Sequence, residues 1–235
     1  MTSAKLLKRL RIDDPARFRL AAFDGADTCG IDLDKDEAKT MLDGDVKQLA
    51  GLQERLYAEH RWAVLIVLQG MDAAGKDIWK DRYKNIRAFE RHLACNGVLI
   101  LNFFLHVSKE EQRRRFLERL DEPAKRWKFN MGDIAERKLW NKYMAAYEDM
   151  IRATSLPEAP WYVVPADHKR FARLVVATAI IEGLEGLDLE FPRVEGKALA
   201  ELQKVRAALV GERSSHGGSA PARRRRKSDG RPSKR

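Results

Sequence analysis

The segment GMDAAGKD, residues 70–77, has residue types and spacing suited to holding phosphate. It fits the pattern G-x-x-x-x-G-K between an apolar run and a helix-forming segment, which is the setting of a phosphate-binding loop. Glycines let the backbone turn its N–H groups toward phosphate oxygens, and Lys76 brings positive charge to the terminal phosphates. The alternative is a plain glycine turn with Lys76 exposed. The phosphate-binding residues that this pattern predicts are Gly70, Ala73, Ala74, Gly75, Lys76 and Asp77.

Two acidic residues in this segment indicate a metal ion. Asp77 stands where a Ser or Thr hydroxyl usually binds Mg²⁺, and Asp72 lies inside the loop. A carboxylate repels phosphate unless a cation lies between them, and carboxylate oxygens are good Mg²⁺ ligands. We therefore expect Mg²⁺ as the cofactor, with Asp72 as a metal ligand.

A second candidate is the basic stretch from Lys109 to Lys128, interrupted by Trp127. Its other basic residues are Arg113, Arg114, Arg115, Arg119, Lys125 and Arg126. A flexible basic segment can close over a phosphate chain and neutralise charge in the transition state. The alternative is a solvated helix face whose arginines pair with Glu110, Glu111, Glu118 and Asp121. The sequence leaves both interpretations open.

A third candidate follows the apolar run 161–167. Asp167, His168 and Lys169 come at the carboxyl end of this predicted strand, where open α/β sheets bind ligands. A structural turn is an equally good interpretation. The isolated histidines do not have triad partners at a recognisable spacing, so a nucleophilic hydrolase has little support.

The elements that would position these residues alternate between strand and helix. Continuous apolar runs predict strands at 63–69, 98–107 and 161–167, the first of them suited to burial on both faces. Periodicity and end signals predict helices at about 35–60, 77–97, 109–120, 133–153 and 168–187. Ser108 and Glu111 have capping-box spacing, and 121–132 is predicted to be a loop. The alternation predicts an α/β fold with a parallel sheet flanked by helices.

Composition excludes several classes of protein. Of 235 residues, 44% are hydrophobic and 34% charged, as in a soluble domain with a full core. The apolar runs are too short to cross a bilayer, the N-terminus has no signal-peptide pattern, and two cysteines cannot build a disulfide framework. We therefore expect a cytoplasmic protein that does not contact a membrane.

The net charge of +10 comes mostly from the C-terminus. Residues 213–235 hold nine Lys or Arg and one Asp, which leaves +2 for the rest of the chain. Because this segment is rich in Ser, Gly, Pro and Arg, we expect a disordered tail that either attracts a polyanion or only aids solubility. The predicted organisation is an irregular arm (1–34), a catalytic domain (35–190), a C-terminal helix (191–212) and the tail (213–235).

Several long segments resemble the polyphosphate kinase 2 family. In chain order they are LQERLYAEHRWAVLIVLQGMDAAGKD, RYKNIRAFERHLACNG, FFLHVSKEEQRRRFLERLDEPAKRWKF, RKLWNKYMAAYEDM and APWYVVPADHKRFAR. The resemblance covers about residues 15–190. It implies a P-loop kinase-like fold and phosphoryl transfer between inorganic polyphosphate and a nucleoside mono- or diphosphate (ADP, AMP or GDP) with Mg²⁺. It also implies a homo-oligomer. We do not expect nucleic acid as a partner of the domain, whereas a nucleic-acid-binding role of the arginine-rich tail stays open.

The resemblance assigns roles to individual residues. Gly70, Gly75 and Lys76 match the Walker A loop, and Asp72 and Lys76 become the predicted catalytic residues. The segment around 113–128 matches the family's helical lid. The predicted lid residues are Arg113, Arg114, Lys125 and Lys128.

The chain departs from the family after the loop. In the family, the loop is followed by a helix and by a strand with a Walker B-like FNRS or FDRS motif. In this chain Asp77 is followed directly by IWKDRY. Only one helix fits between the strands at 63–69 and 98–107, so a neighbouring strand would be missing and the sheet would end in an edge or a gap. The alternative to an enzyme is an internally deleted, catalytically impaired member that only binds polyphosphate. An ATP-dependent small-molecule kinase is less consistent with the motifs.

Overall fold

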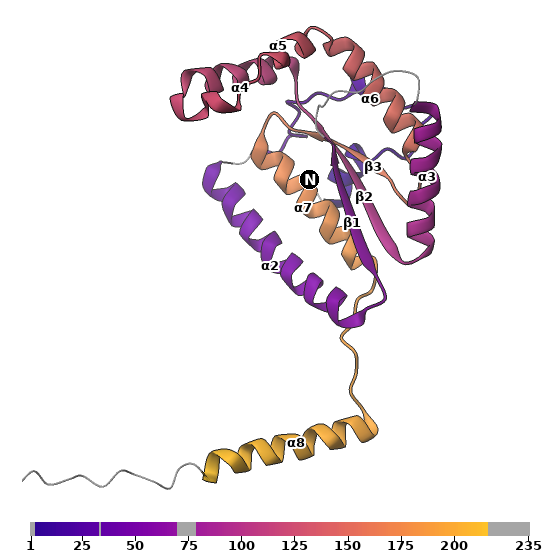
Figure 1. Ribbon diagram of the computed structural model, residues 1–235, viewed down its shortest axis with the longest axis vertical. Helices are drawn as coiled ribbons and strands as arrows, with labels where there is room; N and C mark the ends of the chain where they lie inside the picture. Colours follow the sequence, from indigo (N-terminus) through magenta and orange to yellow (C-terminus); the bar gives the residue numbers. More distant parts are fainter. Residues whose placement is uncertain (1–2, 33, 70–78, 216–235) are drawn as a thin grey trace, which may run out of the picture. The chain divides into compact units, whose positions relative to one another are not determined.

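The computed structural model describes residues 3–32, 34–69 and 79–215 (Figure 1). The chain divides into two compact units, Met1–Phe191 and Pro192–Arg235. The second unit contains helix α8 (Gly196–Ser215). Of the predictions above, the phosphate-binding segment 70–77 and most of the basic tail lie outside the described residues.

A three-stranded parallel sheet forms the centre of the first unit. Its strands are β1 (Ala63–Gln69), β2 (Val98–His106) and β3 (Trp161–Pro165), in the order β1-β2-β3. Leu65 pairs with Ile100, and Phe104 pairs with Val163. The predicted α/β fold with a parallel sheet is confirmed, and the first strand has the predicted bounds.

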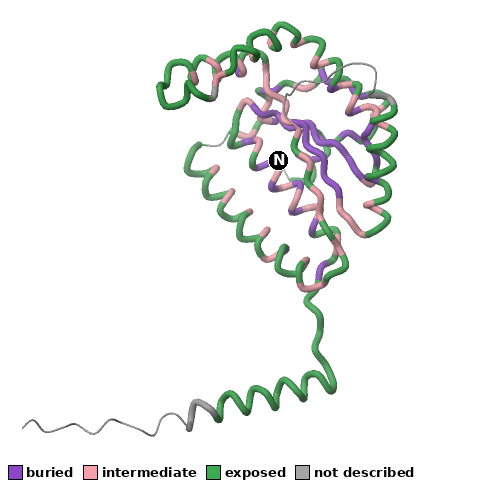
Figure 2. The backbone as a smooth tube through the Cα atoms, in the orientation of Figure 1, coloured by how far each residue is buried: buried purple, intermediate pink, exposed green. Residues whose placement is uncertain are grey.

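Helices cover both faces of the sheet (Figure 1). Helix α7 (Lys169–Glu185) packs on one face with α2 (Lys35–Glu59) outside it, whereas α3 (Trp79–Cys95) and α6 (Trp140–Thr154) cover the other face. Phe103 packs toward α7, and Phe104 packs toward α6. Both phenylalanines are fully buried, so β2 is the centre of the core (Figure 2). Among the described residues, no helix has both the length and the apolar character needed to cross a membrane.

Strand β1 is the edge of the sheet, which corrects the prediction that both of its faces are buried. Among the described residues it pairs with β2 alone. Ile66 and Leu68 are therefore 40% and 58% exposed, although the strand's sequence is as apolar as that of a buried strand. The strand itself was predicted correctly, but its burial also depends on what lies beside it, and within the described ranges no second strand pairs with it.

Three segments differ from their predictions. The N-terminal arm is not wholly irregular, because α1 (Ser3–Leu10) buries three leucines and a 3₁₀ turn covers Leu20–Ala22. The loop after α4 (Lys109–Asp121) contains the 3₁₀ helix η2 (Pro123–Lys128). The predicted helix 133–153 is divided into α5 (Gly132–Arg137) and α6. The Arg137 side chain, which bonds the Lys109 carbonyl at 2.7 Å, holds α5 against α4.

Candidate active site

The carboxyl ends of all three strands meet at one edge of the sheet. There β1 leads directly into residues 70–77, β2 into α4, and β3 into α7. This is where ligands bind in open α/β sheets. The predicted loop residues fall outside the described part of the chain: Gly70, Asp72, Ala73, Ala74, Gly75, Lys76 and Asp77. The described surroundings of this edge include two hollows lined by residues of α4.

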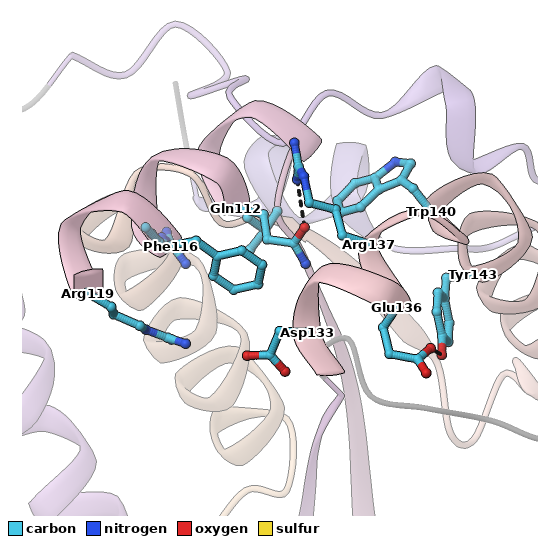
Figure 3. Close-up of a pocket in the computed structure, with 10 residues that line it drawn as sticks. Gln112, Phe116, Arg119, Asp133, Glu136, Arg137, Trp140 and Tyr143 are labelled. Atoms are coloured by element: carbon cyan, nitrogen blue, oxygen red, sulfur yellow. Dashed lines mark hydrogen bonds between the residues drawn. The ribbon is translucent and has the colours of Figure 1, made fainter. Parts of the chain in front are cut away.

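The first hollow is a cavity of about 380 Å³ between α4, α5 and α6 (Figure 3). It is lined by Val107, Gln112, Arg115, Phe116, Arg119, Asp133, Glu136, Arg137, Trp140 and Tyr143. Three arginines, two acids and three aromatic rings thus surround one space. Such a lining can hold a planar ring by stacking and an anion by guanidinium contacts.

Arg119 is the available cation of this cavity. Its guanidinium lies 5.8 Å from the centre of the Phe116 ring, and it forms no ion pair with any described residue. By contrast, Arg137 donates to Gln112 Oε1 at 2.7 Å, and Tyr143 donates to Glu136 (Figure 3). Arg119 can therefore bind an incoming anion without first breaking an ion pair.

The second hollow, of about 800 Å³, lies between α4 and the beginning of α7. Arg114, His168, Lys169 and Arg170 contribute to its lining. Lys169 and Arg170 form no ion pair among the described residues, and they stand in the first turn of a 17-residue helix. The helix dipole and these two cations favour an anion at this end.

Asp167, which lines the second hollow, joins the end of β3 to the beginning of α4 and to the N-terminal arm. Its Oδ1 accepts a hydrogen bond from the Ser108 backbone N–H at 2.7 Å, and its own N–H donates to the Gly25 carbonyl at 3.0 Å. Gly25 approaches so closely that an added Cβ would lie 2.8 Å from the Ser108 nitrogen. Asp167 is thus engaged in structure, as the turn interpretation predicted, while Lys169 faces the hollow.

His106, at the carboxyl end of β2, also holds the N-terminal arm. Its Nε2 lies 3.1 Å from the Phe23 carbonyl oxygen, so this nitrogen carries the proton and donates. Burial lowers the pKa of His106, which keeps the ring neutral. This histidine therefore has a structural role: it attaches the N-terminal arm to the end of β2.

Three of the predicted lid residues, Arg113, Arg114 and Lys125, are paired with neighbouring acids. Arg113 binds Glu110, with its Nε 2.9 Å from Oε1. Arg114 binds Glu111 at 2.6 Å and also Glu118, and Lys125 binds Glu122. Lys128 lies in η2. The solvated-face interpretation thus describes α4 in this state, and phosphate would have to compete with carboxylates for these cations.

Glu111 is the centre of this ion-pair network. Hydrogen bonds from Arg114 and then Arg115 lower its pKa to about 2, against the effect of its burial. Arg115 also donates to the Ala166 carbonyl at 2.8 Å, which links α4 to the end of β3. The predicted capping box is half formed, because Ser108 Oγ accepts from the Glu111 N–H at 3.1 Å while the Glu111 side chain turns to the arginines.

Sequence reasoning missed the α5 and α6 side of the first cavity. Asp133, Glu136, Arg137 and Trp140 follow the spacing i, i+3, i+4 and i+7, which puts them on one helical face. That spacing was the available signal. Arg170 was also missed, although it follows directly after Lys169.

The described residues do not contain a complete metal site. No three His, Cys, Asp or Glu side chains gather among them.

Sequence comparisons extend these observations. The family model described as Polyphosphate kinase 2 (PPK2) matches residues 78–192. An AMP/ADP-polyphosphate phosphotransferase of Meiothermus ruber is 36% identical, and the match covers 80% of this chain and 97% of the relative. An ADP-polyphosphate phosphotransferase of Rhodopseudomonas palustris is 48% identical over 58% of this chain, which spans 47% of that relative's length.

A solved structure has a similar fold. The crystal structure of Polyphosphate Kinase 2 from Arthrobacter aurescens TC1 matches with a TM-score of 0.77 at 29% identity. The match covers 90% of this chain and 97% of that one. The similarity therefore extends over nearly the whole architecture and is not confined to one motif.

Proposed function

This chain belongs to the polyphosphate kinase 2 family, and from that premise we propose that it transfers a phosphoryl group between inorganic polyphosphate and a nucleoside mono- or diphosphate. The observation that carries this proposal is the shared edge of the sheet. Strand β1 leads into the G-x-x-x-x-G-K segment, and two hollows with unpaired cations lie at the ends of β2 and β3.

Two charged substrates must be held in line for such a transfer. We assign phosphate binding to the backbone N–H groups of 70–77 and to Lys76, and charge neutralisation to Arg119, Lys169 and Arg170. The lid arginines Arg113 and Arg114 would exchange their glutamates for phosphate oxygens when the substrate binds. The protein's contribution is thus positioning and electrostatic stabilisation.

The first cavity suits the acceptor nucleotide. Phe116, Trp140 and Tyr143 offer ring faces for a base, and Arg119 offers charge for its phosphates. The relatives named above act on AMP or ADP by their names. We propose AMP and ADP as acceptors here, with GDP as a further one.

Magnesium is the proposed cofactor. Asp72 and Asp77 both belong to the segment 70–77 and would supply carboxylate oxygens, and Mg²⁺ commonly takes one or two carboxylates plus substrate phosphates. The donor set therefore fits this ion. When bound, it would neutralise the charge of the phosphates that Lys76 contacts.

The decisive experiment incubates the purified chain with polyphosphate, Mg²⁺ and ADP, AMP or GDP in parallel and measures nucleotide products. We expect product with at least one acceptor. Lys76→Ala should lower the rate at least 100-fold without changing the melting temperature, whereas Arg17→Ala, at an arginine 90% exposed in the N-terminal arm, should retain activity. Binding of polyphosphate without turnover for any acceptor would contradict the proposal.

An internal deletion after the loop remains part of the proposal. The match to the Meiothermus ruber protein spans 258 positions, but it covers 80% of this 235-residue chain, about 188 residues. About 70 positions of the relative thus have no counterpart here, which supports a missing block. The exposed edge of β1 is consistent with that block having contained its neighbour.

We also propose a homo-oligomer in the cytoplasm. Ile66 and Leu68 expose apolar surface beside a strand edge to which no other described strand is bonded, and such a surface favours association with another chain. Cys29 and Cys95 are both free thiols, as is usual in a reducing compartment.

A further inference from the structure

The core contains a pair of polar side chains, Glu90 and Asn102, in which one oxygen of each has no hydrogen-bond partner among the described residues. Asn102 lies in the middle of β2 and is fully buried, and Glu90 of α3 faces it with 6% of its surface exposed. Asn102 Nδ2 donates to Glu90 Oε1 at 3.1 Å and to the Ala159 carbonyl at 3.3 Å. Neither Asn102 Oδ1 nor Glu90 Oε2 has a partner among the described residues.

The two unused oxygens belong to the same pair. If Glu90 were ionised, both would be buried acceptors without a donor among the described residues, and each unsatisfied group would cost free energy. A proton on Oε2 turns that atom into a donor, and Asn102 Oδ1 is the acceptor it needs. One proton therefore satisfies both atoms and closes a ring of two hydrogen bonds between acid and amide.

We propose that Glu90 is held as a neutral carboxylic acid, hydrogen-bonded head to head with Asn102, and that this proton-bearing pair fastens α3 to the centre of the sheet. Helix α3 is the first described element after residues 70–78, so the pair fixes the helix that follows the phosphate loop. Loss of this proton as the pH rises would weaken the attachment.

The surroundings of Glu90 favour the neutral form. Leu65 of β1, Leu93 of α3, and Leu156 and Ala159 before β3 form the adjoining apolar cluster. The charged neighbour that acts on Glu90 is Glu158, which Arg91 binds at 3.1 Å and Arg87 also faces. From α6, Asp149 acts on Tyr83 of α3. Burial is the main reason that the pKa of Glu90 is raised, and Glu158 adds to it.

The test compares the pH dependence of unfolding in the wild-type chain and in Glu90→Gln. Glutamine reproduces the donor and acceptor of the protonated acid but cannot titrate. Because the folded pKa is raised, the stabilising proton is fully present below the unfolded value of about 4.3 and is lost as pH rises. We expect the folding equilibrium constant of wild type, divided by that of the variant, to fall about tenfold per pH unit above that value until the folded pKa is reached.

A swapped pair provides the second measurement. Glu90→Gln combined with Asn102→Asp exchanges acid and amide while keeping both side-chain lengths, so the double variant should fold and should again lose stability as the pH rises. A wild-type to Glu90→Gln ratio that stays constant with pH, or that rises with pH, would overturn the proposal. So would an unfolded Glu90→Gln chain, because its amide offers the same hydrogen bonds as the neutral acid.

Discussion

Asp167 Oδ1 lies 2.7 Å from the backbone nitrogen of Ser108, and this bond ties the end of β3 to the beginning of α4. Ser108 in turn caps α4 through its hydroxyl, which accepts from the Glu111 N–H. The helix that carries the proposed lid arginines is therefore positioned by a carboxylate that follows strand β3.

Replacing Asp167 with Ala should loosen this junction. The Ser108 N–H would lose its acceptor in a partly buried place, so we expect a loss of about 1–3 kcal/mol in the free energy of unfolding. Urea denaturation measures it. Asp121→Ala, at the exposed end of the same helix, should change stability by less than about 0.5 kcal/mol. Equal effects of the two substitutions would contradict the assigned role.

Glycines 25 and 44 should respond oppositely to alanine. A Cβ at Gly25 would lie 2.8 Å from both the His106 carbonyl oxygen and the Ser108 nitrogen, so the arm would have to move and stability should fall by about 1–3 kcal/mol. Gly44 lies within α2 with open space around it, and alanine there should stabilise by about 0.5–1 kcal/mol. Thermal denaturation of both variants tests the difference, and a neutral Gly25→Ala would mean that the arm is not packed as described.

Glu111→Gln should destabilise the protein in a pH-dependent manner. Its arginine hydrogen bonds lower the folded pKa to about 2, so the charged form stabilises the fold above the unfolded pKa. We expect a loss of about 1–3 kcal/mol at pH 7. The difference from wild type should shrink as pH falls from 4.5 toward about 2, where the native carboxylate also becomes protonated. Denaturation series at pH 7, 4 and 3 would reveal it. A gap of constant size would argue against this ion-pair network.

Arg119→Ala should weaken substrate binding without unfolding the chain. Its guanidinium lies over Phe116 at the cavity and has no carboxylate partner in the described structure. We expect KM for the nucleotide to rise at least tenfold, with an unchanged melting temperature. Arg126→Ala is the matched control, because that side chain bonds the Leu120 carbonyl and does not line the cavity. The same KM for both variants would place the acceptor elsewhere.

The β1 edge provides a test of self-association. Leu68→Lys places a charge on exposed apolar surface beside the unpaired edge, and edge lysines oppose strand pairing. Sedimentation at several concentrations should show a smaller species for this variant. Val46→Lys, on an equally exposed part of α2, should leave the assembly unchanged. An unaltered oligomer in Leu68→Lys would assign the interface to another surface.

Local features were predictable from the sequence, and features formed by distant segments were not. Strand β1 and the Ser108 cap were predicted correctly, because each is encoded within a few adjacent residues. The exposure of Ile66 escaped prediction, since it depends on which strands lie beside β1. The cavity likewise joins α4 to α5 and α6, and no local pattern pairs Arg119 with Tyr143.

The outer position of β1 has a consequence that isotope labelling can detect. Alternate peptide groups of this strand point away from β2, so their amide hydrogens should exchange with deuterium much faster than those directed at it. Slow exchange of the outward-pointing amides of β1 would therefore show, residue by residue, that another polypeptide has paired with this strand.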